Sequence, residues 1–414
     1  MNHFSYHGGE LYAEQVPLRR IAERYGTPCY VYSRASLEQA YQEFVAAFSG
    51  CEHLVCYAVK ANSSLALLNV LARLGSGFDI VSGGELQRVL AAGGKPANTV
   101  FSGIGKTADE MRQALAAGIL CFNVESEPEL LRLDRVAAES GTTARVSLRV
   151  NPDVDPRTHP YIATGLKQNK FGVPHKDAIT LYRKAAGLRH LSIAGIGCHI
   201  GSQLTELSPF IEALDRVLGL VRELATDGIT VTHIDIGGGL GIRYRDESPP
   251  AFADYARALM TRLGTRPLKL LLEPGRALVG NAGVLLTRVE YLKQGAAGRF
   301  AIVDAAMNDL MRPALYDAYH DVQPVRTDGG RGEIYDIVGP VCETGDFLAR
   351  ARELALRESD LVAIMSAGAY GMSMSSNYNS RPRAAEVMVD NEDAHLVRSR
   401  ETISDLMATE RMLP

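Results

Sequence analysis

Residues 54–60 read Leu54-Val-Cys-Tyr-Ala-Val-Lys60, an apolar run that ends in a charged side chain. Similar runs recur up to residue 273, separated by amphipathic stretches rich in Ala and Leu. The eight runs are 54–60, 77–82, 99–103, 121–126, 145–151, 193–200, 233–238 and 268–273. Strands that alternate with helices build parallel sheets, and eight such units favour closure over a doubly wound open sheet. The sequence therefore predicts an α/β fold of the (β/α)8 TIM barrel type.

The pattern changes after about residue 280. Strand-like runs then follow one another without long intervening helices, at 284–293, 300–305, 333–341, 361–366 and 386–390. This arrangement is typical of an antiparallel β domain. The chain of 414 residues is also longer than one barrel requires. We therefore expect a barrel domain over 29–280 and a second, antiparallel β domain formed by 1–28 together with 281–414.

Bulk composition excludes several classes of function. The formal net charge of −4 gives no reason to expect a nucleic-acid or anionic-membrane partner. The six cysteines include no C-x-x-C pair, and the chain has no H-E-x-x-H motif, so we predict no metal site. Neither a signal peptide nor an apolar run long enough for a membrane span is visible. We expect a cytoplasmic protein with reduced thiols.

Polar and titratable residues stand where the predicted barrel strands end, which is where TIM barrels carry their active sites. These residues are Lys60, Asp79, Ser102, Glu125, Arg149, His199, Glu273 and Arg276. Strand ends also meet solvent, so any single member of the set needs no function. The set as a whole predicts a site on this face of the barrel.

Glycine-rich sequence follows the seventh and eighth predicted strands, as Gly237-Gly-Gly-Leu-Gly241 and Glu273-Pro-Gly-Arg276. The recurrent phosphate site of TIM barrels lies after these strands, where glycine lets backbone N–H groups approach the anion. Helix-end electrostatics contribute only ~0.3–1 kcal/mol, so a tightly held phosphorylated cofactor needs a further anchor. Lys60 suits that role, because a lysine at the end of a buried strand favours covalent chemistry with carbonyl groups.

Together these residues resemble the fold-type III pyridoxal 5'-phosphate (PLP) decarboxylases over nearly the whole chain. The ordered motifs that carry the resemblance are Tyr57-Ala-Val-Lys-Ala-Asn62, Phe78-Asp-Ile-Val-Ser-Gly-Gly-Glu85, Arg149-Val-Asn-Pro152, Lys170-Phe-Gly172, Cys198-His-Ile-Gly-Ser-Gln203, Asp235-Ile-Gly-Gly-Gly239, Glu273-Pro-Gly-Arg276, Cys342-Glu-Thr-Gly-Asp346 and Gly368-Ala-Tyr370. Each motif is weak alone, whereas the ordered set is specific.

The resemblance implies a role for each matching residue. Lys60 would hold the cofactor covalently, His199 would stack on its ring, and Glu273 would pair with the ring nitrogen. Cys342 would be the proton donor. The cofactor-binding residues implied are Lys60, Asp79, Arg149, His199, Ser202, Gly237, Gly238, Gly239, Glu273, Gly275, Arg276 and Tyr370, and the substrate-binding residues implied are Arg276, Arg312, Tyr316, Glu343 and Tyr370.

Within this family the chain resembles the members that decarboxylate meso-2,6-diaminopimelate to L-lysine, because Met311-Arg-Pro-Ala-Leu-Tyr316 supplies an arginine for a distal carboxylate. Asp317 departs from the small residue that the family often has at this point. The resemblance also implies a homodimer, in which Cys342 and Glu343 complete the partner's site. Two alternatives remain: a related decarboxylase of ornithine, arginine, lysine or carboxynorspermidine, and a catalytically silent PLP-binding or regulatory protein.

Overall fold

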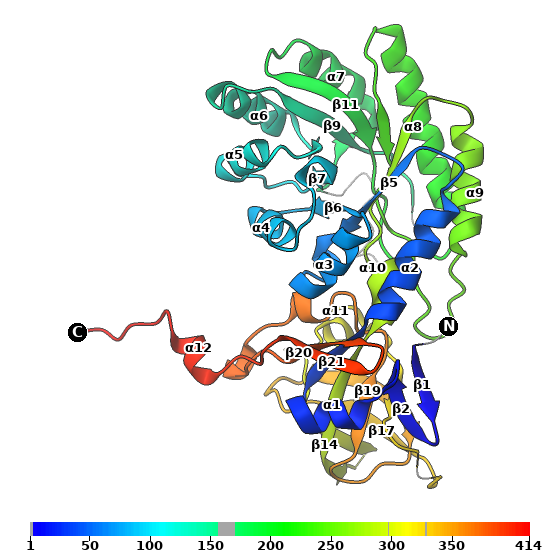
Figure 1. Ribbon diagram of the computed structural model, residues 1–414, viewed down its shortest axis with the longest axis vertical. Helices are drawn as coiled ribbons and strands as arrows, with labels where there is room; N and C mark the ends of the chain where they lie inside the picture. The colour runs from blue at the N-terminus through cyan, green and yellow to red at the C-terminus, as the bar shows by residue number, and fades with distance from the viewer. Residues whose placement is uncertain (1–2, 156–169, 297, 328) are drawn as a thin grey trace. The chain divides into compact units, whose positions relative to one another are not determined.

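The computed structural model describes residues 3–155, 170–296, 298–327 and 329–414 (Figure 1). The chain divides into two compact units. The barrel unit consists of residues 41–242 and 248–277, and the β unit consists of residues 1–40, 243–247 and 278–414.

Within its described residues, the barrel unit contains one parallel strand for each of the eight apolar runs. The strands are β5 (His53–Ala58), β6 (Gly77–Ile80), β7 (Thr99–Phe101), β8 (Cys121–Val124), β9 (Ala144–Asn151), β11 (Leu191–Gly197), β12 (His233–Asp235) and β13 (Lys269–Leu272). They pair in the order β9-β11-β12-β13-β5-β6-β7-β8, and the pairing of β8 with β9 closes the ring. A short strand, β10 (Val173–Pro174), pairs in parallel with the end of β9. The predicted (β/α)8 barrel is confirmed.

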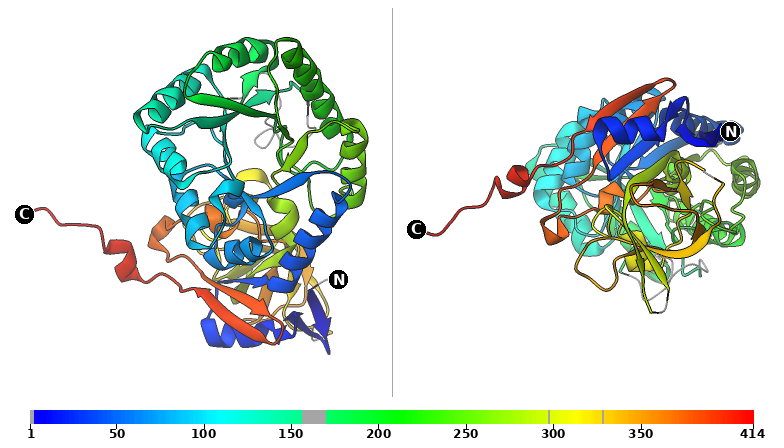
Figure 2. Two further views of the ribbon diagram at one scale, coloured as in Figure 1. Left: turned by 45° about the horizontal axis from the view of Figure 1, so that its top comes forward. Right: turned by 90° about the horizontal axis from the view of Figure 1, so that it is seen from below.

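Helices surround these strands, as the blue to yellow-green part of the chain shows in Figure 2. They are α3 (Leu65–Arg73), α4 (Gly83–Ala91), α5 (Ala108–Ala117), α6 (Glu127–Glu139), α7 (Ala178–Ala186), α8 (Ser208–Thr226) and α9 (Phe252–Leu263), whereas the short helix α10 (Arg276–Val279) crosses the boundary between the two units. Helix α8 buries Phe210, Leu214 and Val217 at helical spacing, which gives it one apolar face for packing. Helix α5 begins with a capping box in which Thr107 and Glu110 exchange hydrogen bonds with each other's backbone.

The β unit is built on a larger sheet, in the order β18-β17-β15-β14-β4-β20-β21, with β19 paired to β14 and β16 paired to β19. Its strands are β4 (Cys29–Ser33), β14 (Gly283–Gln294), β15 (Arg299–Val303), β16 (Val322–Pro324), β17 (Glu333–Val338), β18 (Phe347–Leu354), β19 (Leu361–Ile364), β20 (Ala385–Asp390) and β21 (Asp393–Arg398). A separate sheet contains β1 (Phe4–His7), β2 (Glu10–Ala13) and β3 (Val16–Pro17). The unit also holds α1 (Leu18–Tyr25), α11 (Arg312–Tyr316) and α12 (Ile403–Met407), and α2 (Arg34–Ala47) begins in it.

The larger sheet of the β unit is mostly antiparallel, as the sequence predicts, with two exceptions. Strands β15 and β17 run parallel, and so do β4 and β20. All five residues of β4 are buried, and side chains such as Val31, Val284 and Val387 from three adjacent strands join the core of this unit. Apolar burial on this scale is the main force that holds such a sheet together.

The unit boundaries differ from those that the sequence suggests. The sequence places residues 29–40 at the start of the barrel, whereas the structure assigns them to the β unit, because β4 pairs with both β14 and β20. The short segment 243–247 also belongs to the β unit. The second boundary lies at residue 277 rather than 280. Both differences arise from pairings between segments that are far apart in the chain, which local sequence patterns do not report.

All six cysteines lie in the described part of the chain as free thiols, and only Cys342 among them is classed as exposed. Across the described residues, no helix combines the length and the apolar character that crossing a bilayer demands.

Candidate active site

Five of the residues that the sequence singles out line one cavity of about 440 Å³ in the barrel unit, namely Lys60, Ser102, Arg149, His199 and Glu273. Lys60 follows β5, Arg149 lies near the end of β9, His199 follows β11 and Glu273 follows β13. The carboxyl ends of the parallel strands in a closed barrel meet on one face, which explains why residues so distant in the chain converge. A cavity of this size accommodates a small organic ligand.

Lys60 is oriented by an ion pair with Asp79. Its Nζ donates a hydrogen bond to Oδ2 of Asp79, which is fully buried on β6. The Lys60 side chain keeps 37% of its exposure, so the amine stays accessible from the cavity. The buried carboxylate fixes the direction of the lysine side chain.

Glu273 belongs to a buried polar network at the wall of the cavity. Asn123 Nδ2 donates to Glu273 Oε1 at 3.3 Å and to Asp235 Oδ2 at 3.2 Å, and Ser102 Oγ donates to Glu273 Oε1 at 3.4 Å. Burial raises the pKa of Glu273 well above its usual value, and the nearby Asp235 carboxylate raises it further. Burial also raises the pKa of Asp235. Because desolvated carboxylates favour a cationic partner, this wall suits a protonated ring nitrogen.

His199 offers a neutral, flat ring to the cavity. Its Nδ1 lies 3.2 Å from the backbone nitrogen of Gly238 and accepts that N–H. An amide only donates, so the ring proton must be on Nε2. Burial holds the pKa of His199 well below its usual value, and the positive charges of Arg149 and Lys60 lower it further. A neutral imidazole can stack on a planar, cationic ligand without charge repulsion.

The glycines after β12 are required by close backbone contacts. A Cβ on Gly238 would lie 2.2 Å from the carbonyl oxygen of Glu273, and one on Gly239 would lie 2.5 Å from that of Gly201. Gly237 and Gly239 also have positive φ angles of 69° and 110°. Neither Gly238 nor Gly239 leaves space for a side chain, so the backbone of this segment packs directly against its neighbours.

The turn that carries Arg276 packs against this glycine segment, and Arg276 provides a charged hydrogen-bond donor there. It follows Gly275, is 6% exposed, and donates from Nη2 to Oγ of Ser202 at 3.0 Å. A Cβ on Gly275 would lie 2.9 Å from Cβ of Ala61, so this turn is also tightly packed. A guanidinium, a hydroxyl and glycine backbone are the groups that typically bind phosphate.

Arg149 shapes the cavity wall together with Glu125. Arg149 Nη1 donates to Glu125 Oε1 at 3.1 Å, and its guanidinium lies 4.9 Å from the centroid of the Phe171 ring. Glu125 also accepts the backbone N–H groups of Gly103 at 2.9 Å and Gly172 at 3.0 Å. One carboxylate therefore holds the arginine and two loops of the cavity in place.

The remaining predicted site residues lie in the β unit. Arg312 and Tyr316 are the first and last residues of α11, and Arg312 is only 6% exposed. It is therefore not a solvated surface arginine. Tyr370 is half-buried and has a positive φ of 56°. Cys342 and Glu343 lie on an exposed loop between β17 and β18.

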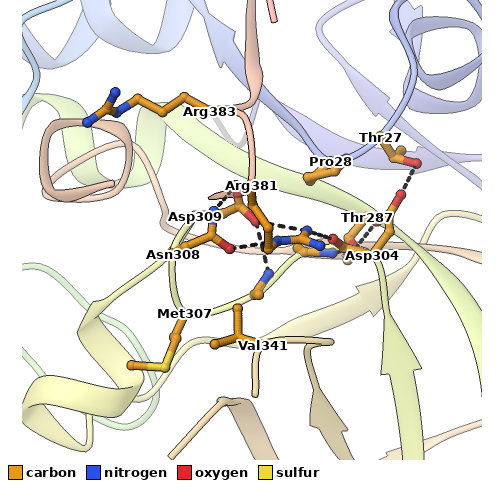
Figure 3. Close-up of polar contacts among 12 residues, drawn as sticks. Thr27, Pro28, Thr287, Asp304, Met307, Asn308, Asp309, Val341, Arg381 and Arg383 are labelled. Atoms are coloured by element: carbon orange, nitrogen blue, oxygen red, sulfur yellow. Dashed lines mark hydrogen bonds and ion pairs between the residues drawn. The ribbon is translucent and has the colours of Figure 1, made fainter. Parts of the chain in front are cut away.

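A buried polar cluster holds the segment that precedes α11 (Figure 3). Arg381 Nε donates to Asn308 Oδ1 at 2.9 Å, and Arg381 also donates to the backbone oxygen of Asp304. Asp309 Oδ2 lies 3.8 Å from Arg381 Nη2, and Asp304 Oδ1 accepts the Thr287 hydroxyl at 2.6 Å. The cluster joins the C-terminal part of the chain to the segment that leads into Arg312.

The loop that carries Cys342 is held by two neighbouring side chains. Asp346 accepts the backbone N–H of Val341 at 2.9 Å and that of Met307 at 2.7 Å. Asn379 Oδ1 accepts the backbone N–H of Cys342 at 2.8 Å. Asn379 has a φ of 55°, which asparagine tolerates better than most residues. The backbone at Cys342 is thus fixed although its side chain is exposed.

Sequence reasoning assigned no role to Asn123, Asp235 or Phe171, although Asp235 and Phe171 stand in motifs that carry the resemblance. Asn123 and Asp235 are polar residues inside buried strands. A polar side chain at a buried strand position needs a hydrogen-bond partner, and that requirement is a signal that the sequence does carry. Asn379 carries no comparable signal, since asparagine in a turn is ordinary.

The cavity fits a phosphorylated pyridine ring such as the PLP that the sequence resemblance implies. It presents an amine at Lys60, a neutral imidazole at His199 and a buried carboxyl group at Glu273. The glycine segment admits no Cβ at Gly238, as a backbone cradle requires. Each group matches one part of that ligand in charge and shape.

Comparison with known proteins finds matches to pyridoxal-dependent decarboxylases in both sequence and structure. Residues 34–280 match the family model for the pyridoxal binding domain of pyridoxal-dependent decarboxylases. The chain is 64% identical to a diaminopimelate decarboxylase of Pseudomonas aeruginosa, over 100% of both chains. It resembles the crystal structure of diaminopimelate decarboxylase from M. jannaschii in complex with L-lysine, at 39% identity and a TM-score of 0.95, over 100% of this chain and 98% of that one. The corresponding enzyme from Helicobacter pylori, also complexed with L-lysine, is 43% identical with a TM-score of 0.92, over 94% of this chain and 98% of that one.

Proposed function

The chain belongs to the PLP-dependent diaminopimelate decarboxylases, and we propose that it converts meso-2,6-diaminopimelate to L-lysine and CO2, the last step of lysine biosynthesis. It is a carboxy-lyase that uses pyridoxal 5'-phosphate. The observation that supports this proposal best is the shared cavity of Lys60, His199 and Glu273 at the carboxyl ends of the barrel strands.

We assign most of the cofactor contacts to residues of the barrel unit. Lys60 would hold PLP covalently, and Asp79 orients its amine. His199 would stack on the ring, while Glu273 would pair with the ring nitrogen and keep it protonated. When bound, PLP supplies an electron sink that accepts the electron pair released as CO2 leaves.

The phosphate is assigned to the groups around the glycine segment. Ser202 and Arg276, which already form a hydrogen bond to each other, supply a hydroxyl and a charged donor. Gly237, Gly238 and Gly239 supply backbone beside them. Arg149 supports the cavity wall through Glu125, and we assign a further phosphate contact to Tyr370.

Substrate selection is assigned to Arg312, Tyr316, Glu343 and Tyr370, together with Arg276. Arg312 would bind the distal carboxylate of diaminopimelate as a fork-shaped donor, and Glu343 suits the distal ammonium. A desolvated guanidinium favours this substrate over ornithine, lysine, arginine and carboxynorspermidine, because these have no carboxylate at their distal end. The burial of Arg312 is the observation that supports the choice.

Cys342 is assigned as the proton donor, with its Sγ supplying a proton to the carbon that has lost CO2. We also propose that the protein is a homodimer in which Cys342 and Glu343 complete the cavity of the partner subunit. The exposure of both side chains on one chain and the fixed backbone at Cys342 support this arrangement.

Substrate profiling of the purified, PLP-loaded protein tests the proposal. CO2 and amine products would be measured with stereoisomers of diaminopimelate and with lysine, ornithine and arginine. We expect meso-diaminopimelate to react fastest and to yield lysine. Turnover of another amino acid at a higher kcat/KM would contradict the substrate assignment, and no CO2 from any of them would support the silent alternative.

The Lys60→Ala variant tests the anchor. We expect it to lose both lysine formation and the visible absorption band of the bound cofactor. Lys95→Ala is the matched control, because Lys95 is exposed on the same unit. Retention of either signal by Lys60→Ala would contradict the assignment of Lys60.

A further inference from the structure

The guanidinium of Arg312 is held by a histidine rather than by a surface contact. Arg312 Nη1 lies 2.7 Å from Nε2 of His320, and the His320 side chain is fully buried. His320 Nδ1 in turn lies 2.8 Å from the backbone oxygen of Met365. The two ring nitrogens therefore have different partners, one that only donates and one that only accepts.

These partners fix the protonation of the ring. The Met365 oxygen accepts, so Nδ1 of His320 carries the proton. The Arg312 Nη1 group donates, so Nε2 must offer its lone pair. A doubly protonated ring would bring two N–H groups against each other at this contact. His320 is therefore a neutral imidazole with one defined tautomer.

Aromatic and backbone contacts restrain the same pair. The Arg312 guanidinium lies 4.6 Å from the ring centroid of Tyr244, and the Tyr244 ring meets the His320 ring edge-on at 5.3 Å. Arg352 Nη2 donates to the backbone oxygen of His320 at 3.0 Å. One face and one edge of the guanidinium are thus engaged by uncharged groups.

The charge of the partner matters for a guanidinium that binds a carboxylate. A carboxylate partner at Nη1 would neutralise Arg312, whereas an imidazole lone pair orients the group and leaves its positive charge intact. Stacking on Tyr244 likewise orients the planar fork without cancelling its charge. These two contacts orient the guanidinium without placing an opposite charge against it.

We propose that His320 is the positioning residue for Arg312, and that it sets the preference for a substrate with a distal carboxylate. This inference rests on the proposed substrate role of Arg312. His320 touches no reacting atom and acts through the arginine alone. Its loss should weaken recognition of the distal carboxylate, and it should leave the chemical step and the cofactor in place.

Two substitutions separate the contacts of His320. In His320→Gln, the side-chain oxygen can still accept from Arg312, because Gln reaches the position of Nε2. In His320→Asn, the shorter amide can still donate to the Met365 oxygen, but it offers no acceptor to Arg312. We expect His320→Asn to raise KM for meso-diaminopimelate about tenfold with kcat within about twofold of wild type, and His320→Gln to stay within about threefold in both.

A double-mutant cycle distinguishes positioning from a general structural effect. The His320→Asn substitution should raise KM no further when Arg312 is already Ala, because the contact it removes is then absent. PLP absorption of His320→Asn should match that of His395→Asn, a control at an exposed histidine of the same unit, and the variant should stay folded at the assay temperature. Additive effects on KM in the cycle, or equal KM values for His320→Asn and wild type, would overturn the inference.

Measurements on the wild-type protein distinguish a failure of this inference from a failure of the proposed function. If wild type turns over meso-diaminopimelate but the His320 variants leave KM unchanged, the function stands and the positioning role fails. If wild type prefers an amino acid with no distal carboxylate, the substrate assignment and the positioning role both fail.

Discussion

The backbone amide of Gly238 donates to Nδ1 of His199, so the glycine segment and the stacking ring are fixed relative to each other. Gly238 also has no space for a side chain, since a Cβ would lie 2.2 Å from the Glu273 carbonyl oxygen. The same backbone position thus joins the proposed phosphate cradle, the ring-stacking residue and the strand end that carries Glu273.

Gly238→Ala should disturb all three elements. We expect the affinity for PLP to fall by about tenfold or more, because a clash with backbone rather than with a flexible side chain forces the segment to move. Cofactor binding is measured by titrating the apo protein with PLP and following its absorption. Gly219→Ala in helix α8 is the control, since its Cβ would meet only Arg222 Nη2, at 3.9 Å. Equal PLP affinity for Gly238→Ala and wild type would rule out the cradle assignment.

Glu85 should make the stability of the PLP-free protein depend on pH. Burial raises the pKa of Glu85 to about 7, above its ordinary value of 4.5. The folded chain therefore holds this proton to higher pH than the unfolded chain, so stability falls as the pH rises from about 4.5 to about 7. The Glu85→Gln variant should lack the contribution of Glu85 to this loss of stability with rising pH.

Thermal unfolding at pH 5 and pH 7.5 checks this prediction. We expect the melting temperature of wild type, relative to that of Glu85→Gln, to decrease by a few degrees between the two pH values. Glu223→Gln, at an exposed position of helix α8, should follow wild type. Parallel curves for wild type and Glu85→Gln would show that Glu85 titrates normally.

Asn379 should control the rate at which Cys342 delivers its proton. Asn379→Gly keeps the positive φ but removes the oxygen that accepts the Cys342 N–H, whereas Asn379→Asp keeps both features. We expect kcat to fall about tenfold in Asn379→Gly, with little change in KM, and to stay near wild type in Asn379→Asp. Steady-state kinetics with matched PLP occupancy distinguish the two variants. A fall of equal size in both would mean that the acceptor oxygen is unimportant.

The proposed homodimer predicts a recovery of activity by mixing subunits. Lys60→Ala and Cys342→Ala chains should each be nearly inactive alone. If each cavity takes Lys60 from one subunit and Cys342 from the other, random mixing should restore about one quarter of wild-type activity. Activity of the mixture after joint refolding is compared with that of each parent treated alone. A mixture as inactive as its parents would place both residues in the same chain's cavity.

Much of the barrel follows from local sequence pattern. The eight apolar runs correspond to β5 through β9 and β11 through β13, because a strand buried on both faces is apolar along its length. Their polar ends supplied Lys60, His199 and Glu273, which line one cavity. The five runs predicted for the second unit also match strands there.

What local pattern missed depends on distant partners. Strand β4 reads as the approach to the barrel, yet its residues pair with β14 and β20. Phe347–Leu354 alternates Ala with Arg and Glu and gives no clear strand signal, although it pairs with β17. The tautomer of His320 and the bond from Cys342 to Asn379 arise only after such pairings bring the segments together. No periodicity in the chain reports them.

The placement of β4 has a consequence for biosynthesis. Residues 29–33 emerge from the ribosome early, but their partners at 283–286 and 385–389 are made only after every barrel strand. The central sheet of the β unit can therefore be completed only after the barrel has been synthesised, and the apolar strand β4 has no partner strand during most of translation. A chain that ended before residue 385 would lack β20, so one edge of β4 would have no partner strand. An unpaired strand edge can pair with another chain and so lead to aggregation.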